Sequence, residues 1–108
     1  MANSKTVTIL KALADPVRLR LFYLLSLGDE LCVCHLTEAL ELPQSTISRH
    51  LALLRHASLV STRRDGKWVY YRMTDETPES LVAFVESNLD TTQSADARRL
   101  SIRLKSCK

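Results

Sequence analysis

The sequence of 108 residues lacks the features that would place it in a membrane or outside the cell. It has no run of about 18 or more apolar residues, so no transmembrane helix is expected. Lys5 and Lys11 interrupt the only early apolar stretch, which argues against a signal peptide. There is also no internal repeat and no low-complexity segment. These absences predict one small domain over residues 1–108, located in the cytoplasm and without a membrane partner.

Cysteine is scarce, and its three positions are Cys32, Cys34 and Cys107. An odd number in a cytosolic chain favours metal or redox chemistry over a structural disulfide framework. On a regular α-helix, Cys32 and Cys34 would project about 200° apart around the axis. Both sulfur atoms can bind one thiophilic ion only if the chain is extended there or the first helical turn is lost. A ligand that bridged them would pull on the helix that follows.

Acidic residues are almost absent from the middle of the chain. Residues 43–73 contain one, Asp65, whereas residues 74–92 contain five acidic residues and no basic one. A basic block of this kind is typical of a nucleic-acid-binding surface, although a plain solvated face has the same composition. The six basic residues of the block are Arg49, Arg55, Arg63, Arg64, Lys67 and Arg72.

The apolar spacing predicts several short helices. A first helix is expected over residues 5–14, and a second after Asp15-Pro16, because Asp favours the N-cap and Pro the first helical position. Gly28 should end the second helix. A third should begin near Val33 and a fourth at Pro43 or Gln44, with a polar outer face. Two short helices joined by a tight turn are typical of a helix-turn-helix.

Two segments rich in β-formers, residues 59–64 and 67–72, flank Asp65-Gly66. This dipeptide predicts a hairpin with a type I′ turn, in which both central residues have positive φ. Beside a helix-turn-helix, such a hairpin is a wing, so the expected fold is mostly α with a β-hairpin wing. A last helix is expected over residues 78–89, and residues 91–108 fit either a flexible or an amphipathic tail.

Four segments together resemble the ArsR/SmtB family of metal-responsive repressors, over residues 5–90. They are ALADPVRLR (12–20), ELCVCHL (30–36), STISRHL (45–51) and DGKWVYYR (65–72). The resemblance implies a winged helix-turn-helix homodimer whose first and last helices form the interface. It also implies that the free protein represses its own operon until an inducer binds. Within the family, the stretch from Glu30 to Cys34 resembles the arsenite- and antimonite-responsive branch, and also the cadmium and lead sensors that share it. The first of these resemblances implies an arsenic-resistance operon.

The chain departs from the patterns of that family. Thr37 stands where many arsenite-responsive members have a third cysteine, and His35 stands where many members have Asp. No cysteine precedes Cys32, unlike in the cadmium and lead branch, and no histidine lies in residues 79–105, where the zinc branch has its site. No constitutive cofactor is expected, and the inducer implied is As(III) or Sb(III).

Trivalent arsenic is soft and prefers three thiolates. Cys32 is expected near a helix N-cap, where the helix dipole lowers the pKa of a thiol. Cys107, an external thiol or His35 could supply the third ligand, although a nitrogen suits zinc or cadmium better. A repressor that responds to Cd(II), Pb(II), Zn(II) or thiol oxidation is therefore the alternative. We expect that closing the bite between Cys32 and Cys34 distorts the third helix and re-aims the fourth.

The candidate DNA contacts lie on the fourth helix and on the wing. Near its N-terminus, the fourth helix should present to the major groove Gln44, Ser45, Thr46, Ser48 and Arg49. Phosphates or the minor groove should be contacted by Arg63, Arg64 and Lys67. Two copies would bind an inverted repeat in double-stranded operator DNA.

Other classes of protein fit the sequence less well. No nucleophile–base constellation and no phosphate-binding loop is visible, so catalysis is not expected. A thiol oxidoreductase would need a Cys-x-x-Cys motif and a βαβ pattern, and both are lacking. A winged helix that binds proteins remains as an alternative, and it would lack salt-dependent DNA binding.

Overall fold

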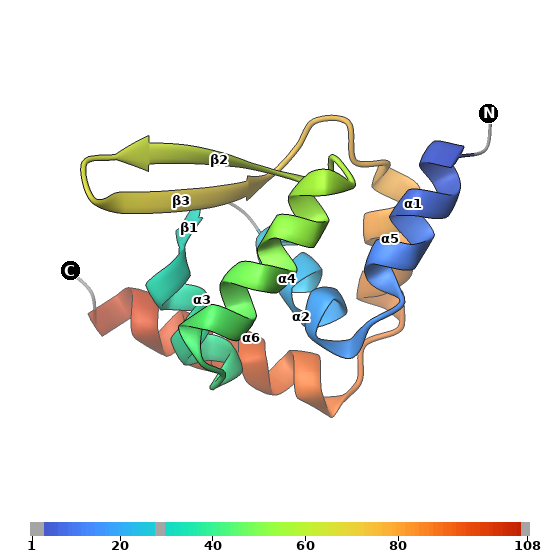
Figure 1. Ribbon diagram of the computed structural model, residues 1–108. Helices are drawn as coiled ribbons and strands as arrows, with labels where there is room; N and C mark the ends of the chain where they lie inside the picture. Colours follow the sequence, from blue (N-terminus) through green and yellow to red (C-terminus); the bar gives the residue numbers. More distant parts are fainter. Residues whose placement is uncertain (1–3, 28–29, 107–108) are drawn as a thin grey trace.

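The computed structural model describes residues 4–27 and 30–106 (Figure 1). The elements follow one another as α1 (Ser4–Leu13), α2 (Pro16–Ser26), β1 (Leu31–Cys32), α3 (Val33–Leu40), α4 (Gln44–His56), β2 (Val60–Asp65), β3 (Trp68–Met73), α5 (Glu79–Ser87) and α6 (Thr91–Ser106). The fold is mostly helical with a β-hairpin, as the sequence predicts for a winged helix-turn-helix, and the short strand β1, which the sequence did not predict, adds a third antiparallel strand. Within the described ranges, no helix has the length and apolar character needed to cross a membrane.

Helix α2 forms the centre of the core and contacts α1, α3, α4, α5, α6 and β3. Five consecutive residues of α2, from Leu21 to Leu25, are buried, which explains why this helix is apolar on most of its sides. Its N-terminus is capped as predicted, since the side chain of Asp15 accepts hydrogen bonds from the backbone amides of Val17 and Arg18. Gly28, the predicted end of α2, lies outside the described residues.

The helix-turn-helix is made by α3 and α4. Glu41 ends α3 with a left-handed backbone (φ 58°), and Pro43 precedes the first turn of α4. The inner faces of both helices are buried, through Leu36, Ala39 and Leu40 on α3 and Ile47, Leu51 and Leu54 on α4. This confirms the predicted positions of both helices.

The sheet has the strand order β1-β3-β2, and the hairpin of β2 and β3 projects from the helical body (Figure 1). The predicted hairpin is confirmed, but the predicted turn is wrong. Asp65 pairs with Trp68, so the central residues of the turn are Gly66 and Lys67. Among the described residues of this turn, only Gly66 has a positive φ, +63°. That is the pattern of a type II′ turn, which needs glycine at its first central position.

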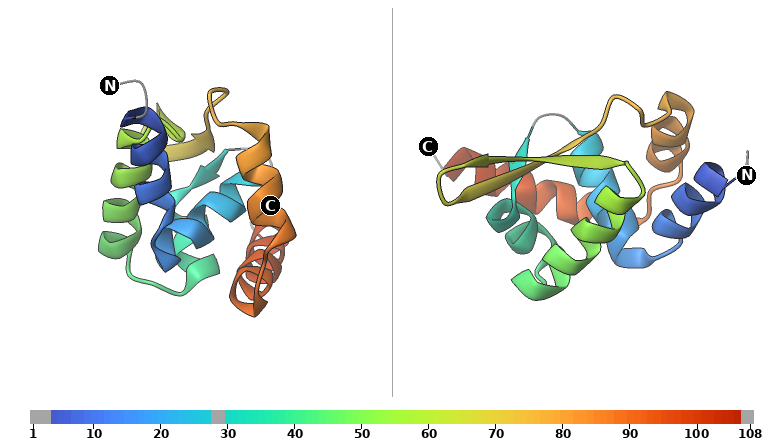
Figure 2. Two further views of the ribbon diagram at one scale, coloured as in Figure 1. Left: turned by 90° about the vertical axis from the view of Figure 1, so that its right-hand side faces the viewer. Right: turned by 45° about the horizontal axis from the view of Figure 1, so that its top comes forward.

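Helix α6 follows the helix that was expected to be the last. It packs along α3 and α2 on the side of the molecule away from α1 (Figures 1 and 2). Asp96 of α6 is fully buried and accepts hydrogen bonds from Arg20 at 2.8 and 3.0 Å and from Arg99 at 2.8 Å. Residues 91–106 therefore form a docked helix, whereas the sequence was compatible with either a flexible or an amphipathic tail.

Candidate functional site

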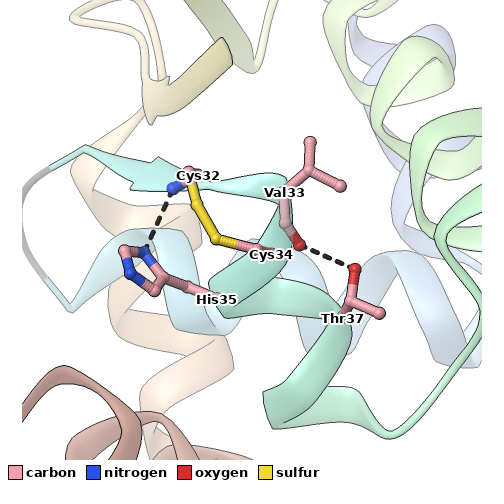
Figure 3. The surroundings of a disulfide bond; sticks show 5 residues. All are labelled: Cys32, Val33, Cys34, His35 and Thr37. Atoms are coloured by element: carbon pink, nitrogen blue, oxygen red, sulfur yellow. Dashed lines mark hydrogen bonds between the residues drawn. A yellow bond between two sulfur atoms is a disulfide. The ribbon is translucent and has the colours of Figure 1, made fainter. Parts of the chain in front are cut away.

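Cys32 and Cys34 meet at the junction of β1 and α3. Cys32 is the N-cap of α3 and has an extended backbone (φ −84°, ψ 161°), whereas Cys34 lies within the first turn of the helix. Their Cα atoms are 5.4 Å apart, and the structure joins the two sulfur atoms as a disulfide (Figure 3). From the sequence, extended backbone is expected at one of the two cysteines if both sulfur atoms are to bind one ion. Cys32 meets this condition, because it lies outside the helix and its side chain does not follow the angular spacing of α3.

His35 lies beside the sulfur atoms. Cys32, Cys34 and His35 each offer one potential metal-ligand atom, a sulfur or a ring nitrogen, and these three atoms all lie within 4.8 Å of one another. The backbone amide of Cys32 donates a hydrogen bond to Nδ1 of His35 at 3.3 Å (Figure 3). His35 therefore also caps the first turn of α3, which is the structural role that its position at the third helical residue allows.

Thr37, at the position where many arsenite-responsive members have a third cysteine, hydrogen-bonds to the backbone of α3. The hydroxyl of Thr37 donates a hydrogen bond to the carbonyl oxygen of Val33 at 2.7 Å (Figure 3). The remaining candidate for a third sulfur ligand, Cys107, lies outside the described residues. Among the described residues, the thiol ligands are thus Cys32 and Cys34.

The cysteine pair opens onto a pocket of about 200 Å³ that also reaches the two elements predicted to contact DNA. Its lining residues are Cys32, Val33, Cys34, Gln44, Lys67, Trp68 and Val69. Gln44 is the first residue of α4, and Lys67 lies in the hairpin turn. Sequence reasoning did not find this proximity, because it depends on the pairing of β1 with β3 between residues far apart in the chain. A ligand at the sulfur atoms would lie next to two predicted DNA contacts.

Helix α4 displays the predicted polar surface. Gln44, Ser45 and Arg49 are exposed, and Thr46 and Ser48 are half-buried. The arrangement leaves the start of α4 accessible for a groove of DNA.

Arg64 and Lys67 of the wing are exposed, but Arg63 is bound to Glu30. Hydrogen bonds with Glu30 raise the pKa of Arg63, and the same bonds lower the pKa of the Glu30 carboxyl. The guanidinium of Arg63 also stacks on Tyr70, 4.9 Å from the ring centroid. Sequence reasoning missed Glu30, because its partner lies on a strand 33 residues further along.

His50 ties α4 to the start of α2. Its Nδ1 atom lies 3.1 Å from Nη1 of Arg18 and 3.8 Å from the carboxylate of Asp15. Burial lowers the pKa of His50, and the charges of Arg18 and Arg49 lower it further, against the opposite effect of Asp15. Arg18 thus donates hydrogen bonds to Nδ1 of His50 and to the carbonyl oxygen of Ala12, the latter at 2.6 Å.

A second surface lies at the other end of the molecule, where α1 and α5 flank a pocket of about 430 Å³. The exposed apolar side chains that line it include Leu10 and Phe84, and Phe84 is 66% exposed. An apolar surface of this kind is unusual on a monomer and is typical of an interface.

Comparison with known proteins agrees with this description. Residues 15–62, from the N-cap of α2 into β2, match the family model for "Bacterial regulatory protein, arsR family". The arsenic resistance transcriptional regulator ArsR1 of Pseudomonas putida is 48% identical, over 86% of this chain and 75% of that protein. The arsenical resistance operon repressor of Escherichia coli K12 is 50% identical, over 67% of this chain and 62% of that protein. The solved structure of HlyU from Vibrio cholerae superimposes with a TM-score of 0.68 at 38% identity, over 80% of this chain and 89% of that one.

Proposed function

Because this chain belongs to the arsR family of bacterial DNA-binding regulators, we propose that it represses an arsenic-resistance operon and that As(III) or Sb(III) at Cys32 and Cys34 releases it from the operator. The observation that carries this proposal is the pocket shared by the two cysteines, the first residue of α4 and the turn of the wing. An ion bound there acts on both DNA-reading elements at once.

The chemistry of the pocket favours a thiophilic inducer. Cys32 and Cys34 supply two thiolates, and soft trivalent arsenic or antimony binds thiolates in preference to oxygen or nitrogen. We propose Cys107 or an external thiol as the third ligand. Cys107 follows α6 directly, and α6 ends on the side of the molecule where β1 and the hairpin tip lie (Figures 1 and 2).

A divalent metal is the second candidate inducer. The imidazole of His35 completes a group of three ligands with the two cysteines, and nitrogen together with sulfur suits zinc or cadmium. Oxidation is the third candidate, because Cys32 and Cys34 can join as a disulfide and then cannot bind an ion. Metal titrations therefore need fully reduced protein.

DNA recognition is assigned to α4 and the wing. We place the polar start of α4 in the major groove, with Gln44 suited to adenine and Arg49 to guanine, and with Ser45, Thr46 and Ser48 beside them. A bidentate contact of this kind contributes roughly 1–3 kcal/mol of discrimination between bases. Arg64 and Lys67 would contact phosphates or the minor groove and make the affinity depend on salt.

A second copy of the chain is the proposed partner of the surface between α1 and α5. Burial of Phe84 and Leu10 against their counterparts would remove two exposed apolar side chains from water. A two-fold dimer presents two recognition helices, which explains the expectation of an inverted repeat. The half-sites should lie about 34–36 Å apart or at a multiple of that distance.

Release follows from thermodynamic linkage. If the inducer binds the free dimer more tightly than the DNA-bound dimer, the affinity for DNA falls by the same factor, typically about 5–150-fold. The relevant test is fluorescence anisotropy of the reduced protein on DNA from its own promoter, titrated in parallel with arsenite, cadmium and zinc. Release by arsenite at low stoichiometry supports the proposal. Release only by cadmium or zinc would identify the inducer as a divalent metal instead.

Two serine variants separate the ligands. Cys34→Ser should keep its affinity for DNA and lose the response to arsenite, because one of the two described thiolates is removed. Cys107→Ser tests the third ligand in the same assay: a weakened arsenite response assigns that role to Cys107, and an unchanged response assigns it to an external thiol. A normal arsenite response from Cys34→Ser contradicts the proposed site.

A further inference from the structure

Glu30 and Arg63 connect the two outer strands of the sheet. Glu30 directly precedes β1, and Arg63 lies on β2, with β3 between them. Nε of Arg63 donates to both carboxylate oxygens of Glu30, at 3.0 and 2.8 Å, and Nη2 donates to one of them at 2.7 Å. Neighbouring strands are about 4.8 Å apart, so this pair bridges about 10 Å across the middle strand.

The same pair lies over the row of residues that contains Cys32. Tyr70 of β3 is opposite Cys32 on one side and opposite Arg63 on the other. Directly opposite residues of antiparallel strands place their side chains on the same face of a sheet. The guanidinium of Arg63 is thus held by a carboxylate in its plane and by the ring of Tyr70 on its face. Bidentate geometry is the case in which a surface ion pair does contribute to structure.

The two cysteines therefore belong to different parts of the molecule. Cys32 is attached to the wing, because it lies on β1, whose partners on β3 are Tyr70 and Tyr71. Cys34 is attached to the helix-turn-helix, because it lies on α3, whose inner face is buried in the core. An ion that binds both sulfur atoms fixes the position of the wing relative to α3.

We propose that Glu30 and Arg63 are positioning residues that make the wing follow Cys32 when the inducer binds. This inference rests on the proposed function and adds how inducer binding reaches the DNA contacts. Part of the loss of DNA affinity arises from displacement of the wing, in addition to any movement of α4. With two backbone-paired residues, β1 alone is a weak attachment. The Glu30–Arg63 pair supplies a third connection, which converts a displacement of β1 into a displacement of the hairpin.

Trp68 allows inducer binding and DNA release to be measured separately. It is the single tryptophan of the chain and lines the pocket of the two cysteines. Its fluorescence therefore reports occupation of the site by arsenite in the absence of DNA. Anisotropy of labelled promoter DNA reports release, and the ratio of the dissociation constants with and without arsenite gives the coupling factor.

The informative variant is Glu30→Gln, which keeps the size of the side chain and removes its charge. Without arsenite it should bind DNA as tightly as the wild type or more tightly, because the substitution removes a negative charge from a basic surface. Its Trp68 response to arsenite should match that of the wild type. Its coupling factor should fall to less than about half of the wild-type value, which typically lies at about 5–150. The exchange Glu30→Arg with Arg63→Glu should restore the factor, since it rebuilds the ion pair.

Asp75→Asn is the matched control. Asp75 pairs with Arg72 of the same hairpin at 3.4 Å, yet it does not touch β1, so its coupling factor should equal that of the wild type. An equal coupling factor for Glu30→Gln and the wild type overturns the transmission role and leaves the proposed function intact. Loss of the Trp68 response in Glu30→Gln also overturns it, because Glu30 would then act on the thiolate site itself. If arsenite does not release the wild type, the proposed function and this inference fail together.

Discussion

Replacing Asp96 with alanine is expected to destabilise the protein far more than the loss of an exposed ion pair. The carboxylate of Asp96 has no solvent-exposed surface, and it binds Arg20, which is 17% exposed, and Arg99, which is 34% exposed. Removing one partner of a buried ion pair costs about 3–5 kcal/mol, because the remaining charge stays buried without its partner. Arg99 can still approach Glu41, 3.8 Å away, so the loss falls mainly on Arg20. We therefore expect a loss near the lower limit, about 3 kcal/mol.

That loss is a large share of the stability of a small domain, which is typically about 5–15 kcal/mol. It corresponds to a decrease in Tm of roughly 10–25 °C for a chain of this length. The assay is urea denaturation followed by circular dichroism at a fixed protomer concentration, since dimerisation would add to the apparent stability. Asp96→Asn preserves the shape of the side chain and serves as the second variant if Asp96→Ala does not fold.

Asp75→Ala is the control for this experiment. Asp75 is 99% exposed in its pair with Arg72, and its removal should change stability by about 1 kcal/mol or less. A free energy of unfolding for Asp96→Ala within about 1 kcal/mol of the control would refute the reasoning. The cluster also reaches the end of α3, since Arg20 donates to the carbonyl of Leu40 at 2.9 Å and Arg99 to that of Ala39 at 2.7 Å. Asp96→Ala should consequently weaken DNA binding as well, through the turn between α3 and α4.

Three further predictions follow from other contacts. Burial is the main cause that lowers the pKa of His50 in the folded protein. As the pH falls below about 6.5, the ordinary pKa of histidine, the unfolded chain therefore takes up a proton that the folded protein does not, and the free energy of unfolding decreases. His50→Gln should flatten that part of the profile in urea titrations at different pH, and an unchanged slope would show that another group titrates. Phe84→Glu should raise the dimer dissociation constant by at least about 30-fold, the effect of an interface residue worth about 2 kcal/mol, as measured by analytical ultracentrifugation. Thr37→Cys adds a thiol three residues after Cys34, on the same face of α3, and should lower the arsenite concentration for half-release. A higher concentration would mean that the lost hydrogen bond from Thr37 to Val33 outweighs the added ligand.

Short-range signals in the sequence predicted most of the helices and the hairpin. Asp15 and Pro16 define the start of α2 through contacts within one helical turn, and the same holds for the break at Pro43 before α4. The hairpin followed from two β-forming segments around a glycine, but the residues at the turn were shifted by one position. Asp-Gly is equally compatible with glycine as the second central residue or the first, and the pairing of Asp65 with Trp68 decides between them.

Long-range contacts explain what the sequence left undecided. Thr91 to Ser94 are poor helix formers, so α6 gains its order from packing on α3 and from the burial of Asp96 between two arginines. An aspartate in a polar segment carries no local signal that it will be buried. The strand β1 has two residues, too few for a recognisable alternating pattern.

The candidate site divides in the same way. The two cysteines and the need for extended backbone at Cys32 followed from the angular spacing of a helix, which is local geometry. The position of the cysteines beside Gln44 and Lys67 depends on how β1 pairs with β3, which sequence spacing does not reveal. The link from Glu30 to Arg63 is non-local for the same reason.

The magnitude of the expected coupling limits how far the DNA-reading elements need to move. A coupling of about 1–3 kcal/mol is typical of allosteric regulation. The discrimination contributed by one bidentate contact to a base is also about 1–3 kcal/mol. If Gln44 contacts a base and the wing contacts phosphates, as proposed, an ion at Cys32 and Cys34 therefore needs to displace only one of these contacts to account for release. Because both elements border the pocket of the cysteines, a local shift is sufficient, and α4 can remain helical and packed on α2 while the operator is released.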